Sequence, residues 1–91
     1  MEINNDQRFT VSPEVLFQEV SGEMVLLDLA SESYFGLDEI GARIWGLLGE
    51  DKNVDQILEV LLREYEVDRE SLEGDLGELL GELLEAGLIE V

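Results

Sequence analysis

Residues Gly22–Trp45 read GEMVLLDLASESYFGLDEIGARIW, and this stretch decides the fold. Met24–Leu29 is a nearly continuous apolar run, which predicts a strand buried on both of its faces. The polar segment Ala30–Ser33 predicts a turn, and Tyr34–Leu37 predicts a second strand. The sequence therefore predicts a short β-hairpin that leads straight into a helical pattern.

A helix is expected directly after this hairpin. Asp38 occupies the position of an N-cap residue, and Gly49 is a suitable residue to follow the last turn. Between them the sequence predicts a helix over Glu39–Leu48, because its apolar residues recur at helical spacing. These apolar residues are Ile40, Ile44 and Leu47.

A further strand is expected ahead of the hairpin. Val15–Val20 has strand character, and Ser21-Gly22 offers a two-residue turn in which glycine supplies a positive φ. The three strands predict an antiparallel meander with Tyr34–Leu37 at its edge, because the chain then leaves the sheet as a helix. Phe9–Val11 predicts a short extended segment, and residues 1–8 are polar and are expected to be flexible.

Two more helices complete the predicted fold. The second is expected to start at Asn53, because Gln56 three residues later completes a capping box. The third is expected to start at Asp68 and to end at Gly87. A three-stranded antiparallel sheet followed by a three-helix bundle predicts an α+β fold, the winged helix-turn-helix, as a single domain over residues 1–91.

The winged helix-turn-helix is best known as a DNA-binding fold, but the charge of this chain argues against DNA as its ligand. The sequence has 23 acidic and 5 basic residues, for a net charge of −18. DNA binding draws much of its affinity from lysine and arginine at the phosphates, and an anionic membrane surface selects the same residues. We therefore expect no nucleic acid or membrane as a partner, and a basic or neutral partner instead.

Catalytic chemistry is not expected from this composition. The chain has no histidine and no cysteine, so the commonest general base and the strongest nucleophile are missing. A zinc site of the usual cysteine and histidine ligands is excluded for the same reason, and no segment has the spacing of a calcium-binding loop. We expect no catalytic residues, no metal and no cofactor.

The N-terminal sequence and the apolar runs indicate a cytoplasmic protein. The first residues lack the basic segment and the apolar segment of a signal peptide. No apolar run approaches the roughly 20 residues that span a bilayer. The absence of cysteine is compatible with a reducing compartment.

The predicted third helix carries glycines at Gly74, Gly77 and Gly81, which fall on one side of the helix. An interior glycine costs about 0.5–1 kcal/mol relative to alanine. Three of them on one side indicate either a surface under no selection or a bare stripe where another backbone docks. The first interpretation is slightly favoured, since an exposed glycine needs no special explanation.

The aromatic pair in the edge strand also allows two interpretations. Strand alternation places one of Tyr34 and Phe35 on the core face and the other on the opposite face. An edge strand exposes backbone N–H and C=O groups that can pair with an added strand. If the N–H of Phe35 lies on that open side, Phe35→Pro should abolish the pairing, because proline has no N–H.

Over residues 15–91 the chain resembles the PqqD-like family of peptide recognition elements. The most diagnostic runs are Tyr34–Asp38 and Gly41–Trp45, and weaker support comes from Tyr65–Asp68 and Gly87-Leu88. A chain of this length with Tyr-Phe-Gly-Leu looks most like the leader-binding proteins of lasso-peptide gene clusters.

This resemblance implies a non-catalytic winged-helix domain that binds the leader segment of a ribosomally made precursor peptide. The leader would add as a strand between the third strand and the third helix, and would be presented to a leader peptidase of the transglutaminase-like cysteine protease type and to a cyclase. Lasso leaders often carry lysine beside a Tyr-x-x-Pro motif, which agrees with an acidic protein. The peptide-binding residues would be Ser33, Tyr34, Phe35, Gly36, Leu37, Leu72, Asp75, Leu76 and Leu79. Which side of the third helix faces the peptide stays open.

Three alternatives compete with this interpretation. The related peptide chaperone of quinone-cofactor biosynthesis has the same residue spacing. A winged-helix transcription factor would need a basic recognition helix, whereas the third helix here is acidic. An acidic regulatory protein that mimics DNA fits the charge but leaves the edge strand without a role.

Overall fold

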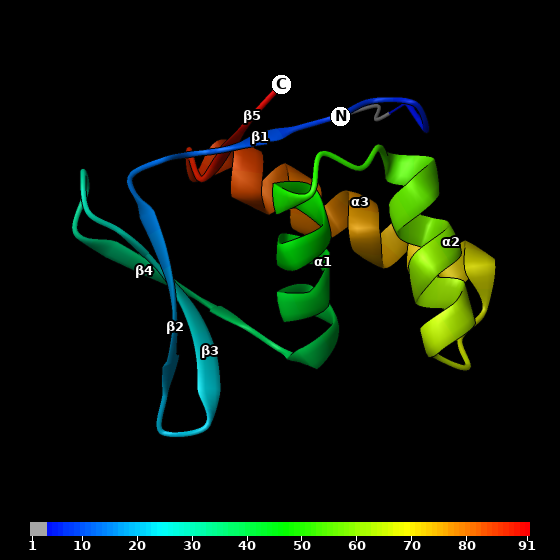
Figure 1. Cartoon of the computed structure of the whole chain (residues 1–91), viewed down its shortest axis with the longest axis horizontal. Coiled ribbons are helices and arrows are strands. Elements are labelled where there is room, and N and C mark those ends of the chain that lie inside the picture. The colour runs from blue at the N-terminus through cyan, green and yellow to red at the C-terminus, as the bar shows by residue number, and fades with distance from the viewer. Residues whose placement is uncertain (1–3) are drawn as a thin grey trace.

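The computed structural model describes residues 4–91, and Figure 1 shows a small sheet beside a group of helices. Strands β2, β3 and β4 form a three-stranded antiparallel sheet, and β1 pairs with β5. The predicted α+β arrangement of one such sheet followed by three helices is confirmed, and it is compatible with a winged helix-turn-helix. The elements are β1 (Thr10–Val11), β2 (Val15–Val20), β3 (Glu23–Asp28), β4 (Ser33–Leu37), α1 (Glu39–Gly49), α2 (Val54–Glu64), α3 (Arg69–Glu85) and β5 (Ile89–Glu90).

The turn between β2 and β3 sets the geometry of the sheet. Ser21 and Gly22 both have positive φ, at 52° and 83°. Two consecutive positive φ values are typical of the type I′ turn, whose twist matches that of the strands it joins. The ladder continues to β4, where Phe35 lies opposite Leu26. The strand order β2-β3-β4 places β4 at the edge, as the sequence predicted.

Residues 4–91 cover only one face of this sheet, so the prediction that β3 is buried on both faces was wrong. Leu26 is 0% exposed, whereas Val25 and Leu27 on the opposite face keep part of their surface in solvent. Leu29 lies just beyond the strand and is 54% exposed. Figure 1 shows the helices on one side of the sheet, with the β2–β3 hairpin extending away from them. An apolar run gives no sign of which face remains open.

Each helix begins at the predicted N-cap. The carboxylates of Asp38 and Asp68 accept backbone N–H groups in the first turns of α1 and α3, at 2.7 and 3.2 Å. Asn53 and Gln56 form the reciprocal capping box of α2, at 2.8 and 2.9 Å. These contacts satisfy N–H groups that have no partner within the helix itself.

The end of α1 differs from its prediction. The helix continues through Gly49, and the positive φ that reverses the chain belongs to Asp51, at 60°. Gly49 is therefore not the residue that terminates the helix. Gly87 does play that role after α3, with a φ of 75°. A short polar residue such as aspartate tolerates this conformation, and glycine is therefore not required there.

The two chain ends close over the helices. Val11 lies opposite Ile89 in the β1–β5 pair, a pairing that the sequence did not predict. The carbonyls of Asn5 and Gln7 accept the first N–H groups of α2, at 2.7 and 3.1 Å. Within residues 1–8, expected to be flexible, residues 1–3 lie outside the described part of the chain.

The core lies between the covered face of the sheet and the three helices, as the list of buried apolar residues shows. The core residues are Phe9, Leu26, Leu37, Ile44, Trp45, Leu47, Leu48, Val54, Ile57, Leu58, Leu61, Leu72, Leu76, Leu80, Leu83, Leu88 and Ile89.

No helix within residues 4–91 combines the length and the apolar character needed to cross a membrane.

Candidate functional site

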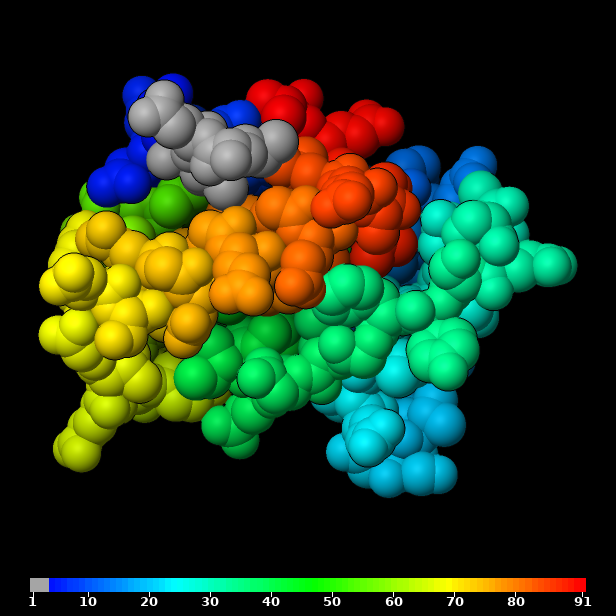
Figure 2. All heavy atoms as spheres, turned by 180° about the vertical axis from the view of Figure 1, so that it is seen from behind, coloured from blue at the N-terminus to red at the C-terminus, as the bar shows by residue number. Residues whose placement is uncertain are grey.

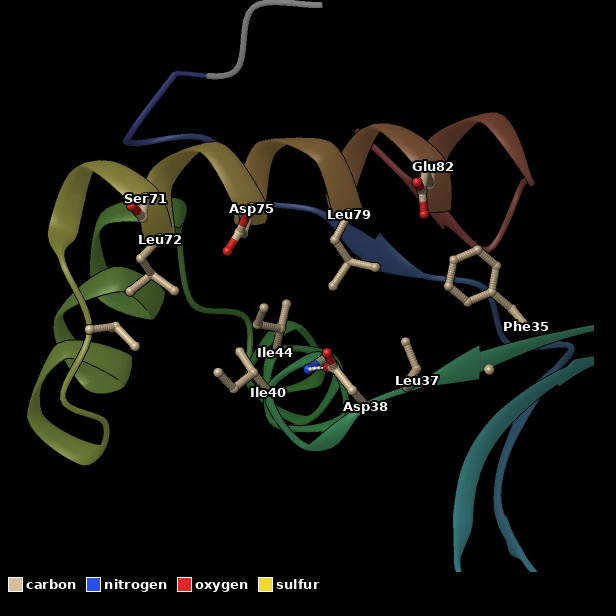
Figure 3. Close-up of a pocket in the computed structure, with 13 residues that line it drawn as sticks. Phe35, Leu37, Asp38, Ile40, Ile44, Ser71, Leu72, Asp75, Leu79 and Glu82 are labelled. Carbon is tan, nitrogen blue, oxygen red and sulfur yellow. Dashed lines mark hydrogen bonds between the residues drawn. The ribbon is translucent and has the colours of Figure 1, made fainter.

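A groove lies between β4, the first turns of α1 and one side of α3 (Figure 3). Its volume is about 640 Å³. Figure 2, seen from behind, shows α3 lying across this side of the molecule, directly above β4 and the start of α1. We refer to it as the β4–α3 groove. Its lining residues are Phe35, Gly36, Leu37, Asp38, Ile40, Gly41, Ile44, Val67, Ser71, Leu72, Asp75, Leu79 and Glu82.

The direction in which the backbone groups of β4 point follows from one hydrogen bond at the far end of the sheet. The N–H of Leu29 donates to the carbonyl of Glu14 at 3.0 Å, which continues the β2–β3 ladder. In an antiparallel ladder, successive residues bond alternately to the neighbours on the two sides. The odd-numbered residues of β3 therefore bond to β2. The even-numbered residues Met24, Leu26 and Asp28 bond to β4.

Within the described part of the chain, this alternation leaves two residues of β4 with free backbone groups. Ser33, Phe35 and Leu37 lie opposite the three residues of β3 that bond toward β4. Tyr34 and Gly36 alternate with them, so their N–H and C=O groups point to the open edge of the sheet. The N–H of Phe35 is therefore used inside the sheet. Proline at position 35 would break the sheet itself, so it cannot test an added strand cleanly.

The two aromatic side chains of β4 lie on opposite faces, as strand alternation requires. Phe35 is packed against the core and lines the groove. Tyr34 is 79% exposed and lies on the uncovered face of the sheet, level with Leu27. Tyr34 therefore offers its backbone to the open edge while its side chain points away from the groove.

The structure brings most of the predicted site residues together. Ser33 and Tyr34 instead line a small cavity of about 40 Å³ beside the end of α3. Leu76 is 1% exposed and lies outside the groove, with its side chain in the core. The predicted site residues that line the β4–α3 groove are Phe35, Gly36, Leu37, Leu72, Asp75 and Leu79.

The side of α3 that faces the groove carries Leu72, Asp75 and Leu79, and not the glycines. A Cβ atom added at Gly74, Gly77 or Gly81 would meet no atom of residues 4–91 within 4 Å. None of the three lines the β4–α3 groove. The glycine side of α3 therefore has room for a Cβ atom at each position, although Gly77 and Gly81 are partly buried. It forms no part of the β4–α3 groove, which agrees with the first of the two interpretations.

Sequence reasoning missed the groove residues contributed by α1 and its cap and by the α2–α3 connection, and two further residues on α3. Gly41 is one of them, and it is closely packed: an added Cβ atom would lie 3.1 Å from the carboxylate of Asp38 and 3.2 Å from the side chain of Leu37. The Gly41–Trp45 run that marks the family resemblance was the available signal. The missed lining residues are Asp38, Ile40, Gly41, Ile44, Val67, Ser71 and Glu82.

The basic residues of the chain lie away from this groove. Arg43 donates two hydrogen bonds of 2.8 Å to Glu64, which join α1 to α2. This hydrogen bonding holds the pKa of the Glu64 carboxyl below its usual value and raises the pKa of Arg43. Arg69 forms ion pairs with Asp55 and Glu73, and the hydrogen bond to Glu73 is the main cause that raises its pKa.

The groove itself is a binding surface of mixed character. Its floor and walls are largely apolar, and its charged lining residues are the carboxylates Asp38, Asp75 and Glu82. Within residues 4–91 no group of three or more carboxylates is placed to hold a metal ion. The arrangement suits an extended polypeptide, because it combines free backbone groups on one side with side-chain contacts on the other.

The sequence of the chain matches the model of a known family. Residues 23–89 match the family described as coenzyme PQQ synthesis protein D, or PqqD. The chain belongs to the PqqD family. No curated protein matches this PqqD family member at a significant level.

Two solved structures resemble this PqqD family member over nearly its whole length. One, TbiB1 in complex with the TbiA(beta) leader peptide, is 41% identical, with a TM-score of 0.80, and the match covers 89% of this chain and 94% of that one. The other, a lasso peptide synthetase B1 complexed with its leader peptide, is 30% identical, with a TM-score of 0.82. That match covers 93% of this chain and 100% of the other.

Proposed function

We propose that this protein binds the leader segment of a ribosomally made precursor peptide, in lasso-peptide biosynthesis. The observation that carries the proposal is the open backbone edge of β4 along a groove beneath α3. Support comes from two relatives of 41% and 30% identity, both solved with a leader peptide. The quinone-cofactor alternative is less favoured, because both of these relatives carry a leader peptide and one is a lasso peptide synthetase.

The leader adds to the sheet as a strand next to β4. Tyr34 and Gly36 provide the backbone N–H and C=O groups for this pairing. The alternate side chains of the leader then enter the groove, where Phe35, Leu72 and Leu79 offer apolar contacts. Main-chain hydrogen bonds supply affinity in this mode of binding, and the groove contacts supply specificity.

The protein acts by presentation and not by catalysis. A bound leader holds the precursor in place for a leader peptidase of the transglutaminase-like cysteine protease type and for a cyclase, all in the cytoplasm. The composition supports a non-catalytic role, since the chain contains no histidine or cysteine to serve as base or nucleophile.

Residue-resolved amide exchange tests strand addition directly. The probe is a synthetic copy of the TbiA(beta) leader peptide, which is the ligand in the 41% identical structure. Exchange at Tyr34 and Gly36 should slow on addition of the peptide, because only these two interior amides of β4 point to the open edge. The amides of Phe35 and Leu37 serve as internal controls, since β3 already protects them. Unchanged exchange at Tyr34 and Gly36 in a saturated complex would rule out pairing at this edge.

A further inference from the structure

Two carboxylates on the groove side of α3 have no ion-pair partner among residues 4–91. Asp75 and Glu82 both line the groove, and within residues 4–91 no basic side chain lies within ion-pair distance of either. The third carboxylate, Asp38, is engaged differently, because it accepts the N–H of Gly41 at 2.7 Å. Asp75 and Glu82 are thus the groove carboxylates available to a ligand.

Their spacing along the helix is well defined. Glu82 follows Asp75 by seven residues (82 − 75), which is close to two helical turns, so both carboxylates lie on the same side of α3 about 10.5 Å apart along its axis. Figure 3 shows Leu79 between them, with all three side chains extending from α3 toward β4 and α1. Along this part of the groove wall, α3 therefore presents an acidic, an apolar and an acidic side chain in that order.

A strand added to β4 has its own spacing, which can be compared with that of the wall. Its groove-facing side chains recur at every second residue, about 6.7 Å apart, so the first and third of them are about 13 Å apart. The excess over the carboxylate spacing is about 3 Å, which the long side chains of lysine and arginine absorb easily. The middle one of the three side chains then falls opposite Leu79.

We propose that the groove selects peptides with the pattern basic–x–apolar–x–basic, in which Asp75 and Glu82 each pair with one basic side chain. The apolar residue between them packs against Leu79 and Phe35. This inference rests on the proposed function and assigns Asp75 and Glu82 as residues that determine specificity. The charge distribution supports the same inference. All five basic residues of the chain lie outside the groove lining, so no basic side chain in the groove competes with the peptide for Asp75 and Glu82.

Selection from a random peptide library displayed on phage tests the pattern without assuming a natural ligand. The bait is the full chain, and Gly36→Pro, which removes one open-edge N–H, serves as the counter-selection bait. Peptides that bind only the wild-type protein should be enriched in lysine or arginine at positions four residues apart, with an apolar residue midway. A pool that depends on Gly36 but lacks this pattern would overturn the inference and leave the proposed function standing. If no peptide is enriched, or if the enriched peptides bind both baits equally, strand addition at β4 fails, and the inference fails with it.

Carboxylate variants then assign the two ends of the pattern. Asp75→Asn and Glu82→Gln should each weaken binding of a selected peptide about two- to fivefold at 0.15 M ionic strength, as expected for partly exposed ion pairs. Glu78→Gln is the matched control, because it removes the same charge from the same helix at a residue outside the groove lining. Replacing one basic residue of the peptide by glutamine should remove the effect of one variant and leave that of the other. Equal losses in all three variants would show that the overall charge of −18 acts alone, which would overturn the assignment.

Discussion

Leu26 and Phe35 lie directly opposite each other on β3 and β4 and bond to each other through their backbones. The same pairing places the side chain of Phe35 on the covered face of the sheet, where it lines the groove. One residue therefore holds the edge strand in place and shapes the groove beside it. The free backbone groups belong to its two neighbours, Tyr34 and Gly36.

Proline substitutions separate these two roles. Gly36→Pro should leave the fold intact, because proline is tolerated in an edge strand where the N–H that it lacks would point to solvent. It should abolish leader binding, because that N–H is one of the groups that pair with the leader. Phe35→Pro should instead lower the melting temperature, since it removes a hydrogen bond to β3. Thermal unfolding and fluorescence-anisotropy binding of both variants measure the two effects. Normal leader binding by a folded Gly36→Pro protein would contradict the assignment of the open edge.

Truncation of two leucines on α3 should separate the core from the groove. Leu76→Ala should cost about 2–5 kcal/mol of unfolding free energy, because Leu76 is 1% exposed within the core. Leu79→Ala should cost less, since Leu79 is only partly buried, and should instead weaken leader binding. Denaturant titrations and binding titrations on both variants distinguish these results. A larger loss of stability at Leu79 than at Leu76 would reverse this division.

The glycine side of α3 should accept alanine. The triple variant Gly74→Ala, Gly77→Ala and Gly81→Ala should raise the unfolding free energy by about 0.5–1 kcal/mol per site. Alanine restricts the unfolded chain, and its Cβ atom meets no atom of the described residues within 4 Å. Leader affinity should stay the same, since these residues do not line the β4–α3 groove. A marked loss of affinity would show instead that the bare stripe is where a peptide docks.

The contact between α1 and α2 should give stability that depends on pH. Arg43 holds the pKa of Glu64 below its usual value, so the stabilisation is present above the pKa that Glu64 has in the unfolded chain. It is lost as the pH falls through the lower pKa of the folded state. The melting temperature of Glu64→Gln should therefore lie below that of the wild type near neutral pH and converge with it in acid. Glu78→Gln is the control, because Glu78 forms no such pair among residues 4–91.

Duplex DNA should not bind at physiological salt. With 23 acidic and 5 basic residues the chain repels phosphates, and DNA binding would need clustered basic side chains. Gel-shift titration with random-sequence duplex provides the measurement. A shift at submicromolar protein that weakens as salt rises would mean that a local basic surface outweighs the net charge.

Local patterns in the sequence were sufficient for the three-stranded sheet, the three helices and most of their boundaries. The caps at Asp38, Asn53 and Asp68 lie where short polar residues precede apolar residues at helical spacing. The Ser21-Gly22 turn was predicted for the same reason, since its conformation depends on residues adjacent in the chain. The edge position of β4 followed from its direct connection to a helix.

Contacts between distant segments were beyond those patterns. The pairing of Val11 with Ile89 joins the two ends of the chain, and nothing in either short segment identifies the other. The exposed face of β3 could not be predicted either, because an apolar run does not reveal which side the helices cover.

The sequence by itself determined the three strands of the sheet, the three helices, the acidic charge and the family resemblance, because each depends on residue identity or on short-range spacing. Only the tertiary structure decided which side of α3 faces β4, since that depends on how the whole helix packs on the core. It placed Leu76 in the core and Leu79 in the groove, although both are leucines of the same helix. It also decided that Tyr34 and Gly36 carry the free backbone groups, because that follows from the register of all three strands.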